Sequence, residues 1–289
     1  MLCQIENGSL RVCADTHGAE LMSIRSAGGT EYLWQGDEAY WKNRAPNIFP
    51  YVARLTEGRY TYRGESYSMP RHGFAPVSEF TPESGGPGSV TFRLDSDERT
   101  YGMYPFRFSY FITYRLDGDT LYIENRVENR DSKTMHFGLG GHPGINVPLD
   151  QGAGFEDYFF EFASCSPRRV EFTPDCFVSG REEPFELENG RMYLRHELFD
   201  DDAVVLRGFA GPVTLRSENG AHGVTLDASG FPLLGFWHKS KSDAPYVCLE
   251  PWMSLPSRSG VVEDFEQQPD LISLPAGETY RVEWSLKFF

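Results

Sequence analysis

Two isolated titratable side chains in apolar, glycine-rich surroundings are the clearest chemical signal in this sequence. His142 lies in the segment 138–144 (GLGGHPG), where its neighbours are glycine, proline and leucine. Glu250 is the one carboxylate in the apolar segment 246–252 (YVCLEPW). Glycines beside a histidine let a ligand approach the backbone closely, and partial burial raises the pKa of a carboxyl toward neutral pH. An imidazole and a carboxyl in these settings can act as the acid and base of a proton-transfer pair.

Each of the two residues also has a structural interpretation. His142 could bond a backbone carbonyl in a tight turn, and Glu250 could point to water from an edge strand. The catalytic interpretation requires the fold to bring both side chains to one pocket, so their relative position and burial decide between the alternatives.

A third region adds a cation and a second imidazole. Arg54 is the only cation in residues 49–55 (FPYVARL), and His72 lies in residues 70–75 (PRHGFA). An arginine in an apolar segment ordinarily pairs with a carboxylate or a ligand. His72 could donate a hydrogen bond to a ligand oxygen, although either residue could equally belong to a core ion pair.

The sequence offers little support for a metal or a nucleotide cofactor. His136 and His142 could share one strand face, but the residues between them are apolar and no HExxH or CxxC spacing occurs. The chain also lacks GxxxxGK[ST], and no GxGxxG opens a helix after a strand. We therefore expect neither a metal site nor a cofactor.

The amino-acid composition restricts which ligands the protein is expected to bind and in which compartment it is expected to act. Lys and Arg total 27 against 42 Asp and Glu, a net charge of −15 that repels nucleic acids and anionic membranes. A neutral small molecule is the favoured ligand. The five cysteines are an odd number without CxxC spacing, as expected for free thiols in a reducing compartment. With no signal-peptide pattern and no apolar run of about 20 residues, we expect a cytoplasmic protein.

The elements that must position these residues are predicted to be strands. Apolar and polar residues alternate over 106–116 and again over 121–127, and Asp117-Gly118 between them favours a tight hairpin turn. Residues 280–288 alternate in the same way. Shorter strands are expected at 90–94, 158–162, 203–206, 213–216, 223–226 and 246–249, a short turn or helix within 30–41, and an exposed turn at 84–88. With no linker or repeat, we predict one all-β domain over residues 1–289, a large antiparallel sandwich with few short helices.

The segments 49–55, 70–75, 138–144 and 248–252 together resemble the aldose 1-epimerase (galactose mutarotase) family, in particular its LacX-like branch. The resemblance covers nearly the whole chain in order and spacing. It implies a galactose mutarotase-like β-supersandwich with an open sugar cleft and no cofactor. It further implies that His142 protonates the ring oxygen of the sugar and that Glu250 takes the proton from the anomeric hydroxyl. His72 and Arg54 would bind sugar oxygens.

The sequence offers several candidates, rather than one, for a sugar-binding aspartate of the family. The better-studied mutarotases use an aspartate on the sugar hydroxyls in the later middle of the chain, and the segment 198–203 (LFDDDA) offers Asp200, Asp201 and Asp202, of which we prefer Asp202. The aromatic platform for the sugar could come from Trp237, Phe74 or Trp252. The remaining histidines, His17, His196, His222 and His238, are expected at the surface.

The resemblance implies an isomerase that interconverts the α and β anomers of an aldohexose, as a monomer or homodimer. Two alternatives stay open. A hexose-6-phosphate epimerase would need a cation cluster at the cleft, for which Arg71, Lys239 and Lys241 are candidates. A non-catalytic sugar-binding or sugar-sensing domain would keep the cleft without turnover.

Overall fold

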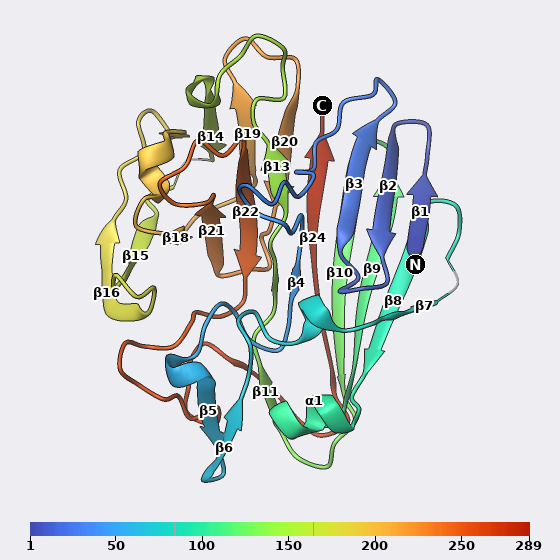
Figure 1. Ribbon diagram of the computed structural model, residues 1–289, viewed down its shortest axis with the longest axis vertical. Helices are drawn as coiled ribbons and strands as arrows, with labels where there is room; N and C mark the ends of the chain where they lie inside the picture. The colour runs from blue at the N-terminus through green and yellow to red at the C-terminus, as the bar shows by residue number, and fades with distance from the viewer. Residues whose placement is uncertain (84, 164) are drawn as a thin grey trace.

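The computed structural model describes residues 1–83, 85–163 and 165–289 and is dominated by antiparallel strands (Figure 1). Position 84, the first of the run expected to form a turn, lies outside the described residues. One large sheet has the strand order β17 (Arg191–Tyr193), β14 (Tyr158–Phe162), β19 (Val213–Ser217), β20 (Gly223–Asp227), β24 (Thr279–Phe288), β10 (Thr120–Asn129), β9 (Phe108–Asp117), β8 (Ser89–Asp95) and β7 (Thr81–Glu83).

A second large sheet carries the strands that form the site. Its order is β16 (Val178–Pro184), β15 (Arg168–Phe172), β18 (Val204–Arg207), β21 (Leu233–Trp237), β22 (Tyr246–Trp252), β12 (Gly140–Gly141) and β4 (Asn47–Ile48), and β13 (Gly144–Asn146) also pairs with β22. The smaller sheets are β1 (Leu2–Glu6), β2 (Leu10–Asp15) and β3 (Leu21–Ser26); β5 (Arg59–Tyr62) with β6 (Glu65–Ser68); and β11 (Met135–Phe137) with β23 (Ile272–Leu274).

The strands predicted from alternation are confirmed. Residues 117 and 118 join β9 to β10, and Gly118 adopts the left-handed backbone conformation that the tight turn requires (φ +57°). Tyr110, Ile112 and Leu121 are buried on the apolar face of this hairpin. The all-β prediction of large antiparallel sheets with few short helices is therefore confirmed.

The two large sheets pack through aromatic side chains. Phe160 on β14 and Phe236 on β21 are buried with their ring centroids 4.6 Å apart. Trp284 on β24 packs closely on Gly141 of β12, where a β-carbon would lie only 2.5 Å from the indole. The strand β12 can therefore approach the other sheet only because it has no side chain here.

In the part of the chain that the structure describes, helical structure is limited to α1 (Glu98–Met103) and four short 3-10 turns, Thr56–Gly58, Ala75–Val77, Phe155–Asp157 and His196–Phe199. None of the helices in the described residues is long and apolar enough to cross a membrane. The segment 30–41 contains a turn at residues 38–40 and no helix. The helix α1 was not predicted, although Asp97 caps it by accepting from the Thr100 backbone N–H at 2.7 Å.

Strand β22 explains why two distant segments meet. The sequence predicts that this strand ends at residue 249, before Pro251, but it continues to Trp252. Trp252 pairs with Gly140 of β12, and Cys248 pairs with Gly144 of β13. Residue 142, between these two short strands, is therefore level with residue 250, between the two paired positions of β22.

The segment that carries His72 is held in an unusual backbone conformation. His72 and Gly73 both have positive φ, +63° and +73°. A β-carbon on Gly73 would lie 2.2 Å from the carbonyl oxygen of Phe49, a backbone atom that cannot move aside freely. A non-glycine residue with positive φ often marks a functional position whose strain is offset by its surroundings.

Gly73→Ala is expected to lower the free energy of unfolding by about 2–4 kcal/mol, because it combines left-handed backbone strain with overpacking. Urea denaturation measures this loss. The matched control is Gly64→Ala, because Gly64 also has positive φ (+81°) but has open space around its β-carbon position. Equal losses in the two variants would show that the contact with Phe49 is unimportant.

Candidate active site

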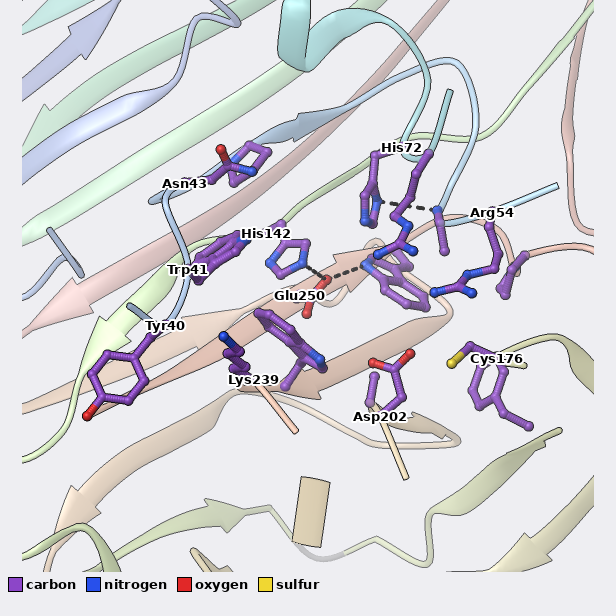
Figure 2. Close-up of a pocket in the computed structure, with 18 residues that line it drawn as sticks. Tyr40, Trp41, Asn43, Arg54, His72, His142, Cys176, Asp202, Lys239 and Glu250 are labelled. Carbon is purple, nitrogen blue, oxygen red and sulfur yellow. Dashed lines mark hydrogen bonds and ion pairs between the residues drawn. The ribbon is translucent and has the colours of Figure 1, made fainter. Parts of the chain in front are cut away.

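A cleft of about 370 Å³ opens over the second large sheet (Figure 2). The residues that line the cleft come from several segments that are far apart in the sequence. Its lining comprises Tyr40, Trp41, Asn43, Pro46, Ala53, Arg54, Arg71, His72, His142, Phe172, Cys176, Asp202, Ala203, Trp237, Lys239, Glu250, Trp252 and Pro256.

His142 and Glu250 meet at the floor of this cleft. The Nε2 atom of His142 lies 3.3 Å from Oε2 of Glu250, and the two residues are 8% and 1% exposed. The interpretation of Glu250 as an edge-strand residue pointing to water is therefore wrong. The structure brings the two predicted catalytic side chains to one pocket, as the catalytic interpretation requires.

Burial moves the pKa values of the pair toward each other. It lowers the pKa of His142 well below its usual range, and the nearby His72 and Arg71 act in the same direction. Burial raises the pKa of Glu250 well above its usual range, while the hydrogen bond from Trp252 opposes this shift in part. Both shifts favour the uncharged forms, a neutral imidazole and a protonated carboxyl, over the ion pair.

Aromatic side chains fix the orientation of the pair. The indole Nε1–H of Trp252 donates to Oε2 of Glu250 at 3.1 Å. The His142 ring stacks on Trp41 with centroids 4.9 Å apart and meets Trp237 edge-on at 5.6 Å. Within the described residues Nδ1 of His142 has no hydrogen-bond partner. The ring is therefore held mainly by packing, with Nε2 directed at the carboxyl.

The His72 side chain can donate a hydrogen bond from its Nε2 atom. The backbone N–H of Ala53 donates to Nδ1 of His72 at 3.3 Å, and the His72 N–H donates to the Ala53 carbonyl at 2.7 Å. Burial, together with the charges of Arg71 and Arg54, lowers the pKa of His72 to about 3. The imidazole is therefore neutral near pH 7, and because Nδ1 accepts, its proton is on Nε2.

The structure distinguishes among the three aspartates of segment 198–203. Asp202 lines the cleft, whereas Asp200 accepts from the Lys241 backbone N–H at 3.1 Å and Asp201 is exposed without lining the cleft in the described structure. Arg54, His72 and Trp237 also line the cleft as predicted, so all six predicted site residues meet there.

Other sequence expectations need correction. Phe74, a proposed platform residue, is fully buried in the core and does not line the cleft. His238, expected at the surface, is fully buried and bonds to the Lys239 carbonyl at 2.7 Å. Lys241, a candidate for a cation cluster, likewise does not line the cleft, although Lys239 does.

Sequence reasoning missed Trp41 and Cys176. Trp41 follows an irregular turn, where no periodic pattern indicates which way a side chain points, yet it forms the stacking partner of His142. Cys176 lies at the cleft with positive φ (+62°). Burial and the neighbouring Asp202 raise the pKa of its thiol to about 11, so the thiol is protonated near pH 7.

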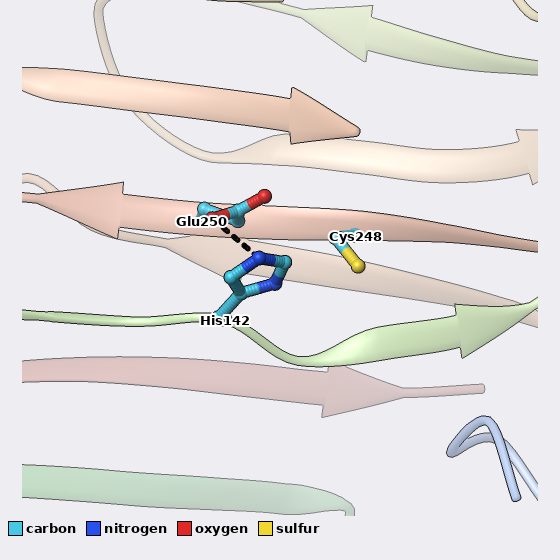
Figure 3. A group of neighbouring side chains, drawn as sticks. All are labelled: His142, Cys248 and Glu250. Carbon is cyan, nitrogen blue, oxygen red and sulfur yellow. Dashed lines mark ion pairs between the residues drawn. The ribbon is translucent and has the colours of Figure 1, made fainter. Parts of the chain in front are cut away.

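Cys248 lies beside His142, on the same strand, β22, as Glu250 (Figure 3). One donor atom each of His142, Cys248 and Glu250 lies within 4.8 Å of the others, close enough to be considered as metal ligands. Burial raises the pKa of the Cys248 thiol well above its usual range, and metal binding requires a thiolate. The donor set therefore suits proton transfer better than metal binding.

The fold and the cleft define a β-sandwich protein with a buried imidazole and carboxyl pair in an open, partly aromatic pocket. The family model of aldose 1-epimerase matches residues 1–287, and the chain belongs to this family. It is 35% identical to the chromosomal protein LacX of Lactococcus lactis subsp. lactis over 95% of this chain and 96% of the relative.

Two solved structures share the fold closely. A galactose mutarotase-related enzyme from Lactobacillus acidophilus aligns with a TM-score of 0.95 and 31% identity, covering 100% of this chain and 97% of that one. A galactose mutarotase-like protein from Lactobacillus casei aligns with the same TM-score and identity over 100% of both chains. The predicted galactose mutarotase-like β-supersandwich is thereby confirmed.

Proposed function

We propose that this protein is an aldose 1-epimerase that interconverts the α and β anomers of an aldohexose. The observation that carries the proposal is the buried contact of 3.3 Å between His142 and Glu250 at the floor of the cleft. The cleft volume of about 370 Å³ is within the range of small-ligand pockets. Membership of the aldose 1-epimerase family supports the same reaction.

The proposed reaction moves two protons. The Glu250 carboxylate takes the proton of the anomeric hydroxyl while protonated His142 donates to the ring oxygen, and the bond from C1 to the ring oxygen breaks. Rotation about C1–C2 then presents the other face of the aldehyde. Reclosure reverses both transfers, because neutral His142 takes the proton back and Glu250 protonates the carbonyl oxygen.

The proton count of the pair is the same before and after ring opening. The imidazolium and carboxylate together carry one proton, and so do the neutral imidazole and carboxylic acid that follow. Burial favours the neutral pair, and the attraction between opposite charges at 3.3 Å favours the charged pair. These opposing effects keep both states accessible, as a reaction that runs in both directions requires.

The remaining cleft residues are proposed to hold the sugar. His72 donates from Nε2 to a sugar oxygen, Arg54 donates to oxygens on the same side, and Asp202 accepts from ring hydroxyls. Trp237 provides an apolar platform for one face of the sugar. Hydrogen-bond donors and acceptors at defined positions discriminate between hydroxyl stereoisomers.

Polarimetry on freshly dissolved α-glucose and α-galactose tests this function. We expect the approach to anomeric equilibrium to accelerate in proportion to protein concentration, after subtraction of the uncatalysed rate. A sugar-sensing domain would instead bind the sugars, measured by calorimetry, without acceleration. That outcome would contradict the enzymatic assignment.

The pH profile of kcat/KM is expected to have a plateau that includes neutral pH. Activity requires one proton on the pair. Uptake of a second proton is opposed by burial and by the Arg71 charge, so the acid limb should lie below pH 6.5, the usual pKa of histidine. Loss of the remaining proton is opposed by the raised pKa of Glu250, so the alkaline limb should lie well above pH 4.5. Rates from pH 4 to 9 measure both limbs, and an acid limb centred above 6.5 would contradict the assignment.

We further propose that the chain acts as one domain in the cytoplasm, as a monomer or homodimer on a small sugar without nucleic acid or membrane partners. All five cysteines are free thiols, in agreement with a reducing compartment.

A further inference from the structure

The surroundings of His142 oppose the charged form that the proposed reaction needs. Burial lowers the pKa of its imidazole well below the usual range, and His72 and Arg71 act in the same direction. In the proposed reaction His142 must nevertheless carry a proton before the sugar ring opens. A group that stabilises the imidazolium, in addition to the carboxylate of Glu250, would therefore raise the share of the reactive form of the pair.

The distal ring nitrogen of His142 does not supply this stabilisation. The second nitrogen of a functional histidine commonly donates to a carboxylate or a backbone carbonyl, which supports the positive charge. Here Nδ1 is buried and has no hydrogen-bond partner within the described residues. The titratable or charged groups that face the ring are Glu250, Cys248, His72 and Arg71. Of these four only Glu250 can be an anion near pH 7, because burial keeps the Cys248 thiol protonated.

Two indole rings contact the imidazole, and they do so in different geometries. Trp41 stacks on the His142 ring with centroids 4.9 Å apart and an angle of 29° between the planes (Figure 2). Trp237 is nearly perpendicular to the same ring, at 87° and 5.6 Å. A cation within about 6 Å of an aromatic face is attracted by the negative charge density of that face, and tryptophan is the strongest partner. The face of Trp41 therefore stabilises the imidazolium more than the neutral imidazole.

Trp41 is fixed in this position by contacts that do not involve a sugar. The indole N–H of Trp34 donates to the Trp41 carbonyl at 2.8 Å. The Trp41 ring also stacks on Tyr246, with centroids 5.6 Å apart and an angle of 23°. A β-carbon at Gly144 would lie only 3.2 Å from the Trp41 ring, so the missing side chain at this position leaves room for the indole. The stacking on His142 is therefore a property of the free protein.

We propose that Trp41 is a positioning residue of the epimerase reaction, because its indole face stabilises the protonated ring of His142 and thereby favours the charged, reactive form of the pair with Glu250. The role in catalysis rests on the proposed function, whereas the effect on the protonation of His142 does not. A residue that only fills space, or only supports the sugar, would leave this protonation independent of the electron density of the indole.

The test changes the electron density of the indole while its shape is kept. Tryptophan with one, two or three ring fluorine atoms is placed at position 41, and the protonation of His142 is followed by ¹⁵N NMR over the pH range in which the protein stays folded. His142→Gln identifies the signal. Fluorine withdraws electrons from the ring face, so we expect the midpoint of protonation to move to lower pH with each fluorine, by about 0.3–1 pH unit in total.

The rate provides a second measurement. If His142 stays neutral over the whole pH range, the reactive form is a minority of the pair. In that case kcat/KM for glucose or galactose at pH 7 should fall in the same order of analogues, by about 2- to 10-fold in total.

Fluorinated tryptophan at position 284 is the matched control. Trp284 packs on Gly141, the residue before His142, but it does not line the cleft, and the described structure has no ring contact between Trp284 and His142. Fluorination there should leave both the midpoint and the rate unchanged. Equal effects at positions 41 and 284 would show that the stacking geometry is unimportant and would overturn the inference.

The inference and the proposed function can fail separately. If sugars are turned over but neither the midpoint nor the rate responds to fluorination at position 41, the inference is wrong and the epimerase function stands. If the midpoint falls as expected in a protein that turns over no sugar, Trp41 stabilises the imidazolium and the epimerase function fails. A His142 that stays neutral, in a protein that turns over no sugar, would contradict both.

Discussion

Glu250→Gln is expected to lower the rate of anomer exchange by about 10²–10⁴-fold, the usual contribution of a well-placed general base. The substitution keeps the shape of the side chain. Trp252 and His142 both contact Oε2 of Glu250. An amide oxygen at that position can accept from the Trp252 N–H and from a protonated Nε2 of His142, so the local geometry should survive. The amide cannot take a proton from the anomeric hydroxyl. Polarimetry at saturating sugar measures the loss in kcat.

Stability and binding serve as the controls for this variant. Burying a carboxyl is unfavourable, and Glu250 is 1% exposed, so the variant should melt at the wild-type temperature or above it. Sugar binding, measured by calorimetry, should be retained. A stable variant that still binds sugar and turns it over within about 2-fold of the wild-type rate would show that another group is the base.

His142→Gln is expected to lower the rate by about 10²–10⁴-fold as well, because glutamine can hydrogen bond to the ring oxygen but cannot protonate it. His136→Gln is the matched control. His136 is also buried, bonds to Ser273 at 3.0 Å and does not line the cleft. It should retain the wild-type rate.

The double variant carries further information about this pair. Groups that act as a unit lose most of their effect when either one is removed. We therefore expect the variant that lacks both His142 and Glu250 to be little slower than either single variant. Losses that multiply would indicate that the two residues act independently and would contradict the shared-proton mechanism.

Much of the sheet framework could be predicted because its signals are local. Alternation of buried and exposed side chains marks β9, β10 and β24, and the Asp117-Gly118 turn marks the hairpin. The helix α1 also has a local signal, the Asp97 and Thr100 cap. The length of β22 could not be predicted, because proline ordinarily ends a strand and only pairing with strands from elsewhere in the chain carries it past Pro251.

Some residues of the site can likewise be recognised from local sequence, whereas the positions of others depend on tertiary contacts. His142 and Glu250 stand out in sequence because each is an isolated titratable residue in an apolar segment, but their proximity depends on the pairing of β12 and β13 with β22. Trp41 lies in an irregular segment whose side-chain directions follow from tertiary packing. His238 looks polar in sequence and is nevertheless buried, because its hydrogen bonds are satisfied inside the protein.

The central claim is that His142 and Glu250 open and close a sugar ring, and NMR magnetisation transfer between the H1 protons of the α and β anomers at equilibrium tests it most directly. We expect the wild-type protein to accelerate this exchange for at least one aldohexose, neutral or anionic at C6, and Glu250→Gln to return it to the rate in buffer. Exchange at the buffer rate for every such sugar, with the sugar bound to the wild-type protein, would contradict the claim.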